Sequence, residues 1–128
     1  MLKGHRSPEI AAALGSLILS ALVFVRRPLP NNDGVYYLLA AEAFARDGLT
    51  AAIGIYPWPF HSVLIATAAT VFGISTEAAA HGIGALFLAA TSAAFVAVVR
   101  ALGADQRLAW LATAVVLCHP WLNRTRAL

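Results

Sequence analysis

The sequence predicts an all-α polytopic membrane protein with about four transmembrane helices and one amphipathic surface helix. Two observations support this fold class. Of the 128 residues, 60% are hydrophobic and only 12% are charged, whereas soluble domains carry about 45–50% apolar and about 25% charged residues. The few charges also lie mostly at the ends of separate apolar runs. A soluble enzyme is therefore excluded, and the length allows one membrane domain over residues 1–128.

The first predicted span covers about residues 10–26. No charged residue occurs between Ile10 and Val25, and basic residues flank this run on both sides. A secretory signal peptide is the competing interpretation, because such a peptide also has a basic start and an apolar stretch. The run ends in Phe24-Val25-Arg26-Arg27 without a small-x-small cleavage site, which favours an uncleaved anchor.

An external loop is predicted over residues 27–57, and it contains the surface helix. The prolines and asparagines of residues 28–32 prevent the first helix from continuing. Asp33 is then placed as the N-cap of a helix over residues 34–47, which Gly48 terminates. Because this helix is short and mixes charged with apolar residues, we expect it to lie along the membrane surface.

Three more spans are predicted, over about residues 58–73, 77–101 and 106–119. A loop of small residues leads to Tyr56-Pro57-Trp58-Pro59-Phe60, whose aromatic rings are typical of the headgroup level of a membrane. The third span is expected to begin after a cap at Ser75 or Thr76.

Charge and side-chain chemistry exclude several partners and cofactors. The net charge of +3 does not indicate a nucleic-acid partner, and the cations divide too evenly between the two sides for the positive-inside rule to orient the chain. The single Cys118 cannot form an intramolecular disulfide. His61, His81 and His119 are not spaced like metal ligands, so we expect neither a metal nor another cofactor.

Asp33 is the strongest candidate for chemistry. A carboxylate at the boundary between water and lipid suits a general base, although an Asp before a helix is commonly only a cap. Arginine pairs well with phosphate, but interfacial arginines also bind bulk lipid phosphate without specificity. The arginines to which both interpretations apply are Arg26, Arg27, Arg46, Arg124 and Arg126.

Three short motifs, taken in order, resemble the N-terminal part of the GT-C glycosyltransferases. The family group is that of the dolichyl-phosphate-mannose-protein mannosyltransferases and the aminoarabinose transferases. Asp33-Gly34-Val35-Tyr36-Tyr37-Leu38 is similar to the acidic and aromatic opening of the family's first external loop. Tyr56-Pro57-Trp58-Pro59-Phe60 is similar to its Y-P-P-x-x-P element, with Trp58 in place of the second proline. His119-Pro120-Trp121-Leu122-Asn123-Arg124-Thr125-Arg126 is similar to its proline-to-arginine element.

The resemblance implies transfer of a sugar from a polyprenyl-phosphate-linked donor to an acceptor hydroxyl. Asp33 would then act as the catalytic base, and Arg124 or Arg126 would match the family's arginine. The N-terminus would be cytoplasmic and the first loop periplasmic, in a bacterial inner membrane. The residues expected to bind substrate are Tyr36, Tyr37, Arg46, Tyr56, Arg124 and Arg126.

Family members have several hundred residues and more spans, so we expect this chain to be an N-terminal fragment that is inactive alone, with the remainder of a split or truncated transferase as its partner. Four full crossings would put Arg124 and Arg126 on the opposite side from Asp33, unless one short apolar run fails to cross. The alternative function is that of a small four-span accessory or assembly protein without catalysis. A transporter is not favoured, because no span carries a charge at mid-membrane depth.

Overall fold

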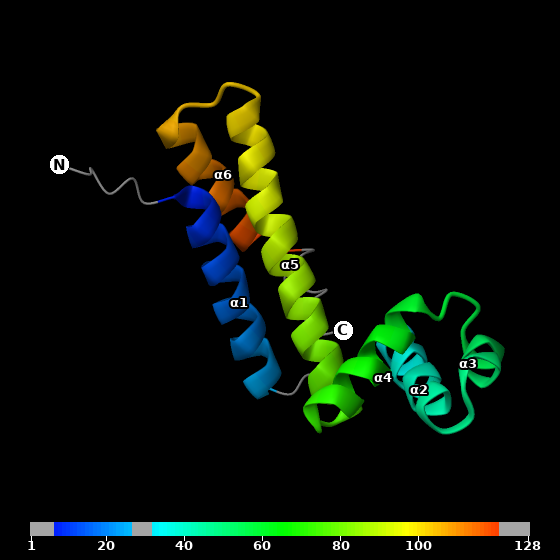
Figure 1. The fold of residues 1–128 in the computed structure, drawn as a ribbon. Helices are drawn as coiled ribbons and strands as arrows, with labels where there is room; N and C mark the ends of the chain where they lie inside the picture. The colour runs from blue at the N-terminus through cyan, green and yellow to red at the C-terminus, as the bar shows by residue number, and fades with distance from the viewer. Residues whose placement is uncertain (1–6, 27–31, 121–128) are drawn as a thin grey trace. The chain divides into compact units, whose positions relative to one another are not determined.

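The computed structural model describes residues 7–26 and 32–120, which form helices joined by turns and contain no strand (Figure 1). The all-α prediction is thus confirmed for these residues. The helices are α1 (Pro8–Arg26), α2 (Asn32–Asp47), α3 (Leu49–Ile55), α4 (Phe60–Phe72), α5 (Thr76–Ala101) and α6 (Gln106–Cys118).

The chain divides into two compact units. The first unit contains α1, α6 and the part of α5 from Ala85 onward. The second unit contains α2, α3, α4 and the part of α5 up to Gly84.

In the first unit, α1 runs antiparallel to α5 and parallel to α6. Arg100 Nη1 near the end of α5 donates to Glu9 Oε1 at the start of α1 over 2.7 Å, and Ser7 Oγ donates to the other carboxylate oxygen of Glu9. The Thr113 hydroxyl of α6 donates to the Pro8 carbonyl of α1 over 3.2 Å. Small and branched residues fill the space between the three helices: Ala12, Val96, Ala109, Ala112 and Val116.

The faces of α1 are the reverse of those of a helix in a water-soluble protein. Its buried positions repeat every four residues and hold small side chains: Pro8, Ala12, Ser16 and Ser20. Its exposed positions hold large apolar side chains: Ile10, Leu14, Ile18, Leu22 and Val25. A soluble amphipathic helix buries its large apolar face, whereas small residues at helix contacts are typical of membrane helices.

In the second unit, α2 packs against both α3 and α4. Its core holds Ala41 of α2, Ile65 and Ala66 of α4, and Ala79 and Ala80 at the start of α5. Gly48 separates α2 from α3 with a φ of +83°, a conformation that glycine adopts without steric cost.

Most helix boundaries follow the local signals in the sequence. Gly48 follows α2 as predicted, and Ser75 rather than Thr76 caps α5, since Ser75 Oγ accepts a hydrogen bond from the Ala78 amide over 3.1 Å. The surface helix starts at Asn32, so Asp33 lies in its first turn instead of at its cap. The segment expected to be a small-residue loop is the helix α3, which packs against α2 and fully buries Ala52.

Two of the four predicted spans are long enough to cross a membrane. α1 has 19 residues and α5 has 26, and both are apolar enough to do so. α4 and α6 have 13 residues each, or about 20 Å at 1.5 Å per residue, which is less than the roughly 30 Å of a bilayer's hydrocarbon core. A four-span architecture therefore does not follow from the helix lengths.

Candidate functional site

Three rings from three different helices meet in the second unit. Tyr37 lies in the second turn of α2, Tyr56 caps the C-terminus of α3, and His61 lies in the first turn of α4. The ring of Tyr37 packs edge-to-face against Tyr56, with 5.0 Å between centroids, and against His61, with 5.1 Å. Such edge-to-face contacts are favourable beyond the apolar area that they bury. We call Tyr37, Tyr56 and His61 the ring cluster.

The two phenols of the ring cluster also approach each other through their hydroxyls. Tyr37 Oη and Tyr56 Oη lie 3.5 Å apart. Their hydrogen bond, together with burial and the nearby negative charge of Asp33, raises the pKa of Tyr37 to about 12. Tyr37 therefore stays protonated at physiological pH and retains a hydroxyl that donates hydrogen bonds.

Asp33 lies on α2 one turn before Tyr37, and its side chain is exposed. A negative charge in the first turn interacts favourably with the helix dipole, so Asp33 stabilises α2 even though it is not the cap. Its exposure leaves the carboxylate oxygens accessible from outside the protein. The position satisfies the first requirement of a general base, which is access to the proton that it removes.

The other predicted site residues are distributed differently. Tyr36 is half exposed next to Tyr37. Arg46 lies in the last turn of α2, about 14 Å along the helix axis from Tyr37 and about 20 Å from Asp33, so the structure does not bring it to the ring cluster. Arg124 and Arg126 lie outside the described residues. In the part of the chain that the structure describes, no group of three His, Cys, Asp or Glu side chains is arranged to hold a metal ion.

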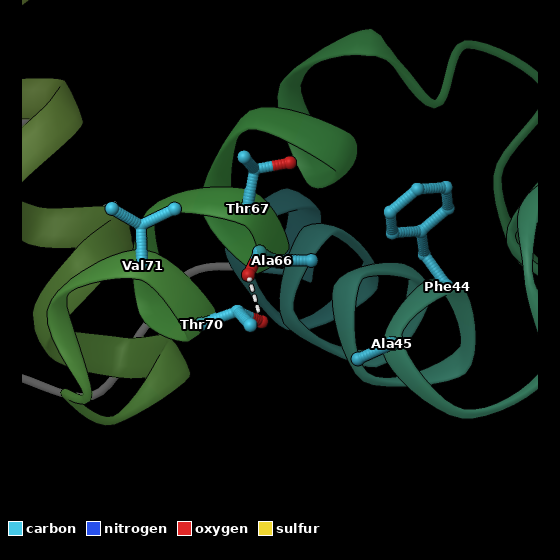
Figure 2. Close-up of a pocket in the computed structure, with 6 residues that line it drawn as sticks. All are labelled: Phe44, Ala45, Ala66, Thr67, Thr70 and Val71. Atoms are coloured by element: carbon cyan, nitrogen blue, oxygen red, sulfur yellow. Dashed lines mark hydrogen bonds between the residues drawn. The ribbon is translucent and has the colours of Figure 1, made fainter.

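A shallow hollow of about 300 Å³ lies between α2 and α4 (Figure 2). The Thr67 and Thr70 hydroxyls at its edge donate to backbone carbonyls of their own helix, over 2.7 and 2.9 Å. The hollow is lined by Phe44, Ala45, Ala66, Thr67, Thr70 and Val71. Because none of these side chains is titratable, the hollow offers an apolar surface and no catalytic group.

His61 was not predicted as a site residue. The histidines are not spaced like metal ligands, so His61 was interpreted as an interfacial polar residue. The one sequence signal for a role in the site is its position directly after the Tyr56–Phe60 segment. Contact with Tyr37 depends on how α4 packs against α2, which local sequence does not show.

Comparison with protein-family models, curated proteins and solved structures finds no match to this chain.

Proposed function

We propose that the chain belongs to a membrane-embedded glycosyltransferase of the GT-C type, which transfers a sugar from a polyprenyl-phosphate-linked donor to an acceptor hydroxyl. One observation carries the proposal. Tyr37 and Tyr56 come from the two loop segments on which the family resemblance depends, they are 19 positions apart, and they contact each other beside the exposed Asp33. The Asp-containing and proline-containing segments thus meet at one place, as parts of one site do.

The surface of the first unit supports a location in a membrane. α1 presents its largest apolar side chains outward and its smallest inward, and α5 exposes Leu86, Phe87, Phe95 and Val98. Exposing such side chains to water is unfavourable at about 25 cal/mol per Å², whereas lipid chains solvate them without cost. We assign the N-terminus to the cytoplasm and the ring cluster to the outer, periplasmic side of a bacterial inner membrane.

The proposed reaction is an inverting transfer. The acceptor oxygen attacks the anomeric carbon, the bond between that carbon and the phosphate oxygen breaks, and the electron pair leaves with the polyprenyl phosphate. Asp33 takes the proton of the acceptor hydroxyl. Tyr36 and Tyr37 lie about one turn after Asp33 on α2, and we assign them to sugar binding. The negative charge on the leaving phosphate requires cations, a role assigned to Arg124 or Arg126 because Arg46 is too far from Asp33.

The proposal is tested by replacing Asp33 with asparagine, which preserves shape and removes the base. Asp47→Asn is a matched control, because Asp47 is an exposed carboxylate at the other end of the same helix. The assay measures transfer from lipid-linked sugars by the full gene product in vesicles. We expect Asp33→Asn to lower turnover by about 10²-fold or more, as loss of a general base does, and Asp47→Asn to change it by less than about twofold.

Unchanged turnover in Asp33→Asn contradicts the assignment of the base. Absence of transfer by the unmodified protein with every lipid-linked sugar donor tried contradicts the proposed function and favours the accessory-protein alternative.

A further inference from the structure

We infer that α2, α3 and α4 do not cross the membrane and instead form a lipid-binding surface on one leaflet, with the segment around Trp58 inserted among the lipids. The inference shares with the proposed function only the location in a membrane, and it does not depend on sugar transfer.

The direction of the helices in the first unit carries the argument. The ion pair of 2.7 Å puts Glu9, at the start of α1, beside Arg100, at the end of α5. Ala12 and Val96, each about one turn further from these ends, belong to the same buried cluster, as expected when α1 and α5 are antiparallel. When α1 crosses the membrane in one direction, α5 crosses back in the other.

The antiparallel direction of α1 and α5 determines whether the chain between them crosses the membrane. The end of α1 and the start of α5 lie on the same side of the membrane, so the chain between Arg26 and Thr76 makes no net crossing. With α4 as a complete span, α1 and α5 would be parallel, and Glu9 and Arg100 would be a bilayer thickness apart, about 30 Å. The length of α4, 13 residues, is independently too short for a complete span.

The surface of this segment indicates lipid as its partner. No Asp, Glu, Lys or Arg occurs from Gly48 to Thr76, although the preceding α2 carries exposed Glu42, Arg46 and Asp47. Trp58 is 80% exposed and Phe60 is 74% exposed, and Leu49 and Ile53 of α3 are also exposed. An apolar surface next to a charged helix, with an aromatic tip, is what partitions into the boundary between headgroups and acyl chains.

Cysteine labelling tests the topology. In a Cys118→Ser background, single cysteines replace Thr50, Ile74 and Leu102, which are all exposed and lie before α4, after α4 and after α5. A membrane-impermeant maleimide is applied to sealed vesicles of known orientation, and detergent-opened vesicles provide the control. We expect positions 50 and 74 to label from the same side, and position 102 to label from the other.

Two results overturn the topology. Labelling of positions 50 and 102 from one side and 74 from the other shows that α4 crosses. Labelling of all three from either side shows that no membrane barrier separates them. Neither result depends on turnover, so it is distinguishable from failure of the sugar-transfer assay.

Trp58 fluorescence tests the lipid contact. The other tryptophans are replaced by phenylalanine (Trp110→Phe and Trp121→Phe), and the protein is placed in vesicles whose lipids are brominated either near the headgroup or near the end of the acyl chain. We expect at least a twofold stronger quenching by the shallow bromines than by the deep ones. Quenching by aqueous iodide with none by either brominated lipid overturns the proposed lipid surface.

Discussion

Replacing Gly15 by alanine tests the packing of α1 against α6, on which the parallel arrangement of these helices depends. Gly15 faces Leu117, and a Cβ at Gly15 would lie 2.7 Å from Leu117 Cδ1 and 3.3 Å from Cδ2. Carbon atoms pack at about 3.5–4.0 Å, so the leucine side chain or the helix has to move. Leu117 packs against the buried cluster of the first unit, which limits where it can go.

The expected magnitude is the sum of two opposing terms. Overpacking of this kind costs about 1–3 kcal/mol, while exchanging a mid-helix glycine for alanine contributes about 1 kcal/mol of helix propensity. Gly15→Ala therefore lowers the free energy of unfolding by about 0–2 kcal/mol. Gly82→Ala in α5 is the matched control, because no atom other than those of its chain neighbours and its own helix backbone lies within 4 Å of the added Cβ, and only the stabilising term applies.

Reversible unfolding in mixed detergent micelles, followed by circular dichroism, measures both variants. Leu117→Ala removes the obstructing methyls, so in that background Gly15→Ala is expected to stabilise as Gly82→Ala does. The coupling energy between positions 15 and 117 is then about 1–3 kcal/mol. If Gly15→Ala stabilises equally with and without Leu117, the described packing of α1 on α6 is wrong.

Two further predictions concern the ring cluster and a helix cap. Since the pKa of Tyr37 is raised from 10.0 to about 12, the stabilisation linked to its proton is complete below pH 10 and is lost as the pH rises from 10 to 12. Absorbance titration at 295 nm should show the transition of highest pH moving to lower pH in a Tyr56→Phe variant, and a Tyr37 transition that stays near pH 12 in that variant contradicts the phenol–phenol hydrogen bond. Asp105 caps α6 by accepting from the Leu108 amide over 2.9 Å, so Asp105→Ala should cost about 1 kcal/mol in the same unfolding assay. Asp105→Ser keeps a capping oxygen and should retain most of that stability; equal losses in both variants contradict the cap.

The helix boundaries were largely predictable because they depend on neighbours in sequence. Gly48 supplies a positive φ, and Ser75 and Asp105 supply capping oxygens within three residues of the amides that they accept from. α3 was missed because its stability comes from burying Ala52 against other helices, and a run of small residues shows no periodicity of its own.

The site was predictable only in part. Asp33, Tyr36 and Tyr37 lie within five residues of one helix, so their proximity follows from sequence. The contact of Tyr37 with Tyr56 and His61 joins α2, the C-cap of α3 and α4, and the separation of Arg46 from Asp33 follows from α2 being one continuous helix of 16 residues.

The sequence by itself determined the helical class and the two long apolar helices, because both follow from composition and from the spacing of charges along the chain. Only the tertiary structure decided the directions of these helices. The hydropathy of an apolar segment is the same whether the segment crosses the membrane in one direction, crosses it in the other or does not cross it completely. Hydropathy therefore does not determine direction. The Glu9–Arg100 ion pair joins positions 91 residues apart in sequence, and it brings the start of α1 beside the end of α5, as in an antiparallel pair of helices.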